Sequence, residues 1–133
     1  MAPPRASASS RISFSPPVVQ VRMEFAPQSV GGAVQVLRSL LGPVRAEPGC
    51  SATRLLRDVD DGGVMTFVEE WRDEASLECH LRAPTFRTIL AVMDLAATAP
   101  TVEIDGISSR RGFDLVVEVL GDTTIDGTQI GDA

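Results

Sequence analysis

The chain has 133 residues, the length of one domain with one hydrophobic core, and its formal net charge is −6. This acidic balance argues against binding to nucleic acid or to an anionic membrane surface, because both partners attract basic proteins. Two cysteines are too few for a disulfide framework, so we expect Cys50 and Cys79 to be reduced thiols of a cytoplasmic protein. No apolar run approaches the roughly 20 residues that span a bilayer.

The N-terminal part of the chain predicts a tail followed by a strand. Residues 1–17 are rich in Ala, Ser and Pro and carry Arg but no acidic residue. They lack the apolar segment of a secretory signal, and although they weakly resemble an organelle transit peptide, no amphipathic stripe is visible, so we expect a disordered tail. Residues 18–25 then alternate, which predicts a half-buried strand with Gln20, Arg22 and Glu24 on its polar face.

The first helix is predicted after Pro27, which ends the strand. Apolar side chains recur at helical spacing over residues 30–44, and Ser29 is a residue that can cap such a helix. The Gly-Pro pair at 42–43 should end or kink it. The Glu-Pro-Gly sequence at 47–49 then predicts a turn.

A hairpin and a second helix are predicted next. Two strand-like segments, residues 50–58 and 64–71, flank an Asp-Asp-Gly-Gly turn at 60–63, and this pattern is typical of an antiparallel hairpin. Asp73 is a good N-cap for the following helix. Pro84 interrupts that helix.

The rest of the chain predicts one more helical piece and two strands. A helical pattern covers residues 86–97, and residues 101–107 alternate as a fourth strand. A polar linker leads to residues 113–120, which we interpret as an extra, fifth strand. The acidic, Gly-rich end at 121–133 is expected to be flexible.

The predicted order β-α-β-β-α-β indicates the α+β class and the ferredoxin-like fold, in which two helices cover one face of an antiparallel sheet. We place this domain at residues 18–108, with a linker and the extra strand at 109–120. The other face of the sheet needs cover, and two sheets packed together would give it to each other. We therefore expect a homodimer.

Two segments carry a family resemblance: EPGC at residues 47–50, and EEWRDEASLECHLRAPTF from Glu69 through Phe86. They resemble the antibiotic biosynthesis monooxygenase domain family, and the resemblance covers roughly residues 18–108. It implies a ferredoxin-like dimer whose two sheets form an α/β barrel. It also implies several chemistries, because the family includes cofactor-independent oxygenases of anthrone-like or quinol substrates, haem-degrading relatives, an isomerase of a small signalling molecule, and members without known activity.

The resemblance suggests roles for two residues. Trp71 matches a family Trp that lines the pocket, and His80 matches a helix His that acts in some members as a base or a haem ligand. Haem-degrading relatives also use an Asn on the first strand, and some oxygenases use a Tyr near the pocket, but this chain has neither Asn nor Tyr. These departures count more against haem degradation than against oxygenation, so we expect no cofactor, with haem as the disfavoured alternative.

The residues themselves leave alternatives open. Trp71 is interpreted as a core residue or as a pocket wall, and His80 as a partly exposed or carbonyl-bonded helix residue, a general base, or a ligand of haem or metal. Glu69 and Glu70 point to opposite faces of their strand, so one faces solvent and the other could face a pocket or a dimer partner. Arg22 could bind an anionic group of a ligand or pair with a carboxylate on a neighbouring strand.

The leading hypothesis is a cofactor-independent monooxygenase that acts on an electron-rich aromatic such as a hydroquinone or a polyketide anthrone. Its catalytic residues are His80, which accepts a phenolic proton, and Trp71, against which the substrate ring lies. The candidate substrate-binding residues are Arg22, Phe86 and Glu69. The alternatives are a non-catalytic dimeric module that binds a hydrophobic small molecule or haem, and an interaction protein that uses its terminal tails.

Overall fold

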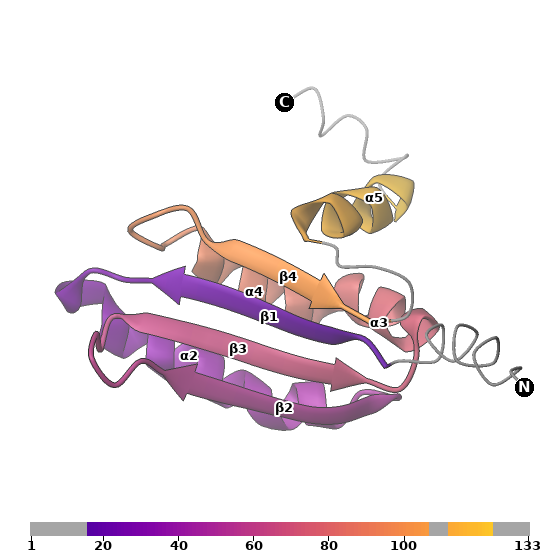
Figure 1. The fold of residues 1–133 in the computed structure, drawn as a ribbon, viewed down its shortest axis with the longest axis horizontal. Helices are drawn as coiled ribbons and strands as arrows, with labels where there is room; N and C mark the ends of the chain where they lie inside the picture. The colour runs from indigo at the N-terminus through magenta and orange to yellow at the C-terminus, as the bar shows by residue number, and fades with distance from the viewer. Residues whose placement is uncertain (1–15, 107–111, 124–133) are drawn as a thin grey trace, which may run out of the picture.

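The computed structural model describes residues 16–106 and 112–123, and Figure 1 shows their arrangement. Residues 1–15, 107–111 and 124–133, which hold most of the tails predicted at 1–17 and 121–133 and the start of the linker predicted from residue 109, lie outside the described residues. Residues 121–123, predicted as part of the flexible tail, belong to helix α5. Among the described residues, no helix combines the length and the apolar composition that crossing a bilayer requires. The elements, in chain order, are β1 (Val18–Glu24), α2 (Pro27–Arg45), β2 (Cys50–Arg57), β3 (Val64–Trp71), α3 (Glu74–Leu81), α4 (Pro84–Met93), β4 (Thr101–Asp105) and α5 (Phe113–Thr123).

The strands form one antiparallel sheet in the order β2-β3-β1-β4, with β2 and β4 at its edges. Figure 1 shows α2, α3 and α4 on one face of this sheet, and α5 contacts β4 and α3. The central pairing places Val19 opposite Glu69 and Met23 opposite Met65. This arrangement confirms the predicted α+β ferredoxin-like fold.

Alternation along the strands separates a buried face of the sheet from an open face. On β1, Val19, Val21 and Met23 are buried beneath the helices, whereas Gln20 and Arg22 are exposed on the other side. Burial of such apolar side chains is the main source of stability, at roughly 25 cal/mol per Å² of apolar surface. The largest buried apolar side chains of the other elements complete this core: Leu37, Met65, Phe67, Trp71, Leu77, Leu81, Phe86 and Ile89.

Residues 113–120 lie in helix α5, so the prediction of an extra strand there is wrong. The helix buries Leu115, Val116 and Val119, whose spacing is that of one helix face. The consecutive apolar side chains at 115–117 break the period of two that a half-buried strand requires. The β propensity of the valines suggested a strand, but packing against β4 and α3 decides the local structure.

Helix α2 begins earlier and extends further than the sequence pattern predicts. Pro27 is its first residue. Proline is well suited to this position, because a backbone N–H there would have no partner within the helix. Ala26 precedes it and gives no side-chain cap. Pro43 lies in the last turn and does not end the helix, which reaches Arg45. The prediction of a Ser29 cap is therefore wrong, and of the two alternatives given for the Gly-Pro pair at 42–43, an end or a kink, the helix end is wrong.

The turn after α2 holds the start of β2 against α3. The Glu47 N–H donates to the Val44 carbonyl at 3.0 Å, and the Arg72 N–H donates to the Gly49 carbonyl at 2.7 Å. Gly49 has a φ of 87°, and a Cβ at this position would collide with Ser76 Oγ. The predicted Glu-Pro-Gly turn is thus present, and its third position requires glycine.

Candidate functional site

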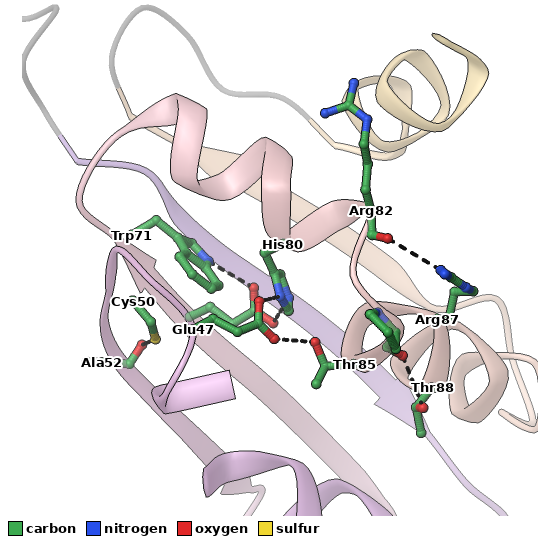
Figure 2. Close-up of polar contacts among 11 residues, drawn as sticks. Glu47, Cys50, Ala52, Trp71, His80, Arg82, Thr85, Arg87 and Thr88 are labelled. Carbon is green, nitrogen blue, oxygen red and sulfur yellow. Dashed lines mark hydrogen bonds and ion pairs between the residues drawn. The ribbon is translucent and has the colours of Figure 1, made fainter. Parts of the chain in front are cut away.

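His80 lies at the centre of a buried hydrogen-bonded cluster (Figure 2). Its Nδ1 is 2.8 Å from Glu47 Oε1, and its Nε2 is 2.9 Å from Glu69 Oε2. His80 is 1% exposed and Glu69 is 0% exposed. Because both ring nitrogens face a carboxylate, this arrangement favours a protonated ring that donates a hydrogen bond on each side.

The second oxygens of the two carboxylates are also hydrogen-bonded. The Trp71 Nε1–H donates to Glu69 Oε1 at 3.1 Å, and the Thr85 hydroxyl donates to Glu47 Oε2. The Trp71 ring stacks on the imidazole with ring centroids 4.6 Å apart, and the Phe86 ring meets the imidazole edge-on at 5.5 Å. Two aromatic rings and two acids therefore fix the position of the imidazole.

The local sequence explains why these side chains converge. Asp73 caps α3, and its carboxylate accepts a hydrogen bond from the Ser76 N–H at 2.9 Å, which fixes where the helix begins. His80 then falls one turn after the buried Leu77, on the same face of the helix. Glu69 lies on the buried face of β3 because side chains alternate along a strand.

The charges in the cluster determine the protonation of His80. Burial by itself lowers the pKa of His80, but the hydrogen bonds and negative charges of Glu69 and then Glu47 outweigh burial. The pKa of His80 therefore lies above its ordinary value of about 6.5. At about pH 6.5, more than half of the protein molecules therefore carry a protonated His80, and only the neutral remainder can accept a proton.

One edge of the cluster opens into a surface cleft with a volume of about 580 Å³, which is within the range of small-molecule sites. Glu47, His80 and Thr85 line this cleft, whereas Glu69 and Trp71 do not. The Glu47 side chain is 18% exposed, and the His80 side chain is not exposed at all. The other lining residues come from α2, the turn after it, and the segments around α3: Pro43, Pro48, Arg72, Asp73, Ala75, Ser76, Cys79, Ala83 and Pro84.

Comparison with known proteins identifies the family. The sequence profile of the antibiotic biosynthesis monooxygenase family matches residues 16–92, which is more than half of the chain. The chain belongs to this family. The matched segment includes Glu47, Glu69 and His80, so the buried cluster lies within the family domain.

Similar proteins cover most of this chain. The uncharacterized protein sll1783 of Synechocystis is 27% identical over 97 residues, which are 72% of this chain and 66%, just under two thirds, of that protein. The structure of PA3566 from Pseudomonas aeruginosa is 26% identical, covers 71% of this chain and 95% of its own, and has a TM-score of 0.63. Rv0793 from Mycobacterium tuberculosis is 27% identical over 69% of this chain and 94% of its own, with a TM-score of 0.64. A crystal structure of an antibiotic biosynthesis monooxygenase is 28% identical in sequence. It covers 67% of this chain and 95% of its own, and has a TM-score of 0.61.

The site residues predicted from the sequence lie in two separate places in the structure. His80, Trp71, Glu69 and Phe86 form one cluster, whereas Arg22 lies on the open face of the sheet, in a small hollow of about 110 Å³. Trp71 is fully buried behind the imidazole, which fits its interpretation as a core residue, and it is not among the residues that line the surface cleft. The interpretation of His80 as a partly exposed helix residue is wrong, because two acids hold it inside.

Glu69 and Glu70 lie on opposite faces of the sheet, as the alternation of side chains along a strand predicts. Glu69 is buried in the cluster. Glu70 lies on the open face and forms an ion pair with Arg54 at 3.1 Å.

Glu47 and Thr85 have no functional role in the prediction from sequence, although the structure places both in the cluster. Glu47 lies 33 residues before His80, so spacing along the chain gives no sign of their contact. Its position at the start of the EPGC segment that carries the family resemblance is the one signal that could have identified it. Thr85 lies between a proline and the buried Phe86, where a helix start is the obvious interpretation.

The cluster does not have the arrangement of a metal site. Within residues 16–106 and 112–123, no three His, Cys, Asp or Glu side chains are placed to hold a metal ion. Cys50 and Cys79 are free thiols, as expected from the sequence. Ligation of a haem iron by His80 would require one of its carboxylate hydrogen bonds to break, because both ring nitrogens are engaged.

Proposed function

We propose that this member of the antibiotic biosynthesis monooxygenase family is a cofactor-independent monooxygenase that acts on an electron-rich aromatic of the hydroquinone or polyketide anthrone type. The observation that supports the proposal is a buried imidazole, held between two carboxylates, at the wall of a cleft of about 580 Å³. Such a group, in its neutral form, can accept a proton from a ring hydroxyl.

His80 is the proton acceptor in this proposal. The proposal requires the neutral tautomer in which Nε2–H donates to the buried Glu69 and the lone pair lies on Nδ1. Nδ1 is the nitrogen on the side of Glu47 and the cleft. Trp71 acts behind the ring, where its stacking and its hydrogen bond to Glu69 hold both groups in place.

The oxidation step balances without a cofactor. Removal of a proton from the anthranol form of an anthrone gives an anion that transfers one electron to dioxygen, and the radical pair combines to form a carbon–oxygen bond. The proton held by His80 returns to the peroxide oxygen. Loss of water then leaves a carbonyl, so that a methylene and dioxygen become a ketone and water.

A second candidate is a module that binds such a molecule without turnover. The observation that favours it is that both nitrogens of His80 are engaged, and that the protonated form of this ring cannot accept a proton. Under this alternative the anthrone is oxidised in air no faster than in the presence of heat-denatured protein.

Incubation of the metal-depleted protein with 1,8-dihydroxyanthrone under ¹⁸O₂ tests the proposal and separates the two candidates. We expect a ketone that carries one ¹⁸O atom, formed faster than with heat-denatured protein. A rate equal to that of the denatured protein would contradict turnover. Haemin added in a parallel titration should give no sharpened absorption band, because His80 has no free nitrogen to offer iron.

We also propose that the chain acts as a homodimer through the open face of its sheet. This face carries the half-exposed Leu56 on β2 and the apolar Val68 on β3, beside the Arg54–Glu70 ion pair. Pairing of two such faces would bury the half-exposed Leu56 and complete the α/β barrel that the family resemblance implies.

A further inference from the structure

The Glu47 carboxylate is the place where the buried cluster meets the cleft. When His80 is protonated, the two oxygens of Glu47 accept hydrogen bonds from His80 Nδ1–H and from the Thr85 hydroxyl. A carboxylate has about four lone-pair sites, so these two bonds leave it able to accept more. Glu69 has a similar number of bonds, but no part of its side chain is exposed. Glu47 is therefore the acid of the cluster that a ligand in the cleft can reach.

The backbone around Glu47 holds this carboxylate in a fixed position. Its N–H donates to the Val44 carbonyl at 3.0 Å, and its carbonyl accepts from the Cys50 N–H at 3.1 Å. Gly49, two residues on, contacts α3 so closely that a side chain cannot be added there. An acceptor that is already in place loses little entropy when a ligand binds to it.

The rest of the cleft wall indicates which ligands suit this acceptor. Within the part of the chain that the structure describes, five of the twelve lining residues, three prolines and two alanines, have small, rigid apolar side chains. The one arginine among the described lining residues, Arg72, lies 3.5 Å from the Asp73 carboxylate. Together with Glu47, Glu69 and a protonated His80, the local charge remains negative, which disfavours an anionic ligand.

We propose that Glu47 accepts the hydrogen bond of a ligand hydroxyl, and that the cleft selects uncharged aromatic molecules bearing a hydroxyl over ethers and over carboxylates. This inference rests on the proposed function for the location of the substrate, but it concerns recognition and not turnover. Glu47 thereby becomes a binding residue that the sequence alone did not indicate.

The test measures binding of three matched probes in the absence of oxygen: 2-naphthol, 2-methoxynaphthalene and 2-naphthoate. Because the chain has one histidine, the imidazole NMR signals of His80 report directly on occupancy of this cleft. We expect 2-naphthol to bind at least about tenfold more tightly than the ether, since a hydrogen bond to a charged group is among the stronger ones, and the carboxylate to bind most weakly. Equal affinities for 2-naphthol and the ether, or no binding of 2-naphthol, would overturn the inference.

Substitution of Glu47 provides the second arm of the test. In Glu47→Gln the preference for 2-naphthol over the ether should fall to about threefold or less, and 2-naphthoate should bind more tightly because one negative charge is gone. Glu74→Gln, in the exposed first turn of α3, is the matched control and should keep the preferences of the unmodified protein. An unchanged preference in a folded Glu47→Gln protein would overturn the inference, and the three-probe comparison on the unmodified protein decides the matter if that variant does not fold.

The two proposals fail in different ways. A clear preference for the hydroxyl probe without oxidation of an anthrone would contradict the oxygenase and leave recognition by Glu47 in place. Oxidation without that preference would contradict recognition by Glu47 and leave the oxygenase in place.

Discussion

Glu69 stabilises two buried donors at once, His80 Nε2–H and Trp71 Nε1–H. Replacing it with Gln leaves one acceptor oxygen and turns an NH₂ group toward the second donor, so a buried group loses its partner. We expect Glu69→Gln to lower the free energy of unfolding by about 3 kcal/mol in urea denaturation. The same change at Glu74, in the exposed first turn of α3, should cost less than about 1 kcal/mol. Equal unfolding midpoints for the two variants would contradict the buried cluster.

The protonation of His80 also makes stability depend on pH. Because its pKa in the folded protein is raised, the stabilisation by the imidazolium is complete below about pH 6.5 and is lost as the pH rises through the folded value. The pKa of the Cys50 thiol is also raised, by burial and then by the charge of Glu69, so its ionisation acts in the same direction at higher pH. The measurement is therefore made in a Cys50→Ala background.

In that background we expect the urea midpoint to fall as the pH rises above about 6.5, and a further His80→Gln substitution to remove this dependence. Over the same interval kcat/KM should rise, because the neutral imidazole is the base. A midpoint that is flat over this interval in the Cys50→Ala protein would show that the two acids do not hold a protonated ring.

At the scale of the elements, the turn between α2 and β2 holds Glu47 in the cluster. We expect Gly49→Ala to destabilise the protein by about 2 kcal/mol, because of the positive φ and the collision with Ser76. Gly31→Ala, in a part of α2 with open space around the new methyl group, should instead be stabilising by up to roughly 1 kcal/mol. Thermal unfolding compares the two, and a similar melting temperature for both variants would contradict the assigned role of the turn.

The sequence predicted those elements in which one periodicity is clear. Residues 18–25 alternate and form a central strand, because one side chain in two faces the core. Residues 64–71 follow a strong turn signal and form the other central strand, which is buried along most of its length. The last element was misassigned because valines favour strands locally, while the helix that actually forms buries Leu115, Val116 and Val119 on one side. The start of α2 was misplaced because proline both ends a strand and begins a helix.

The site was partly predictable for a related reason. His80 and Trp71 are single examples of their residue types, so composition alone drew attention to them. Glu47 could not be found in this way, because one acid among eighteen acidic residues is not distinctive and its contact with His80 spans 33 residues. Only the packing of α3 against the turn after α2 brings these two side chains together.

At the scale of the whole molecule, the proposed homodimer depends on the open face of the sheet. We expect Leu56→Arg to shift the protein from dimer to monomer in light scattering, because a charge would be buried between two sheets. Val59→Arg, in the exposed hairpin turn, is the control and should leave the mass at twice that of the chain. A monomeric unmodified protein at micromolar concentration would contradict the dimer.

The most direct test of the central claim is the rate of oxygen uptake with 1,8-dihydroxyanthrone, compared between the unmodified protein and a folded His80→Gln variant. If the imidazole between Glu47 and Glu69 is the general base, His80→Gln should lower the rate at saturating substrate by about a hundredfold or more. Glu70→Gln should leave that rate unchanged. Equal oxygen uptake by the unmodified protein and the His80→Gln variant would contradict the role of His80 in catalysis.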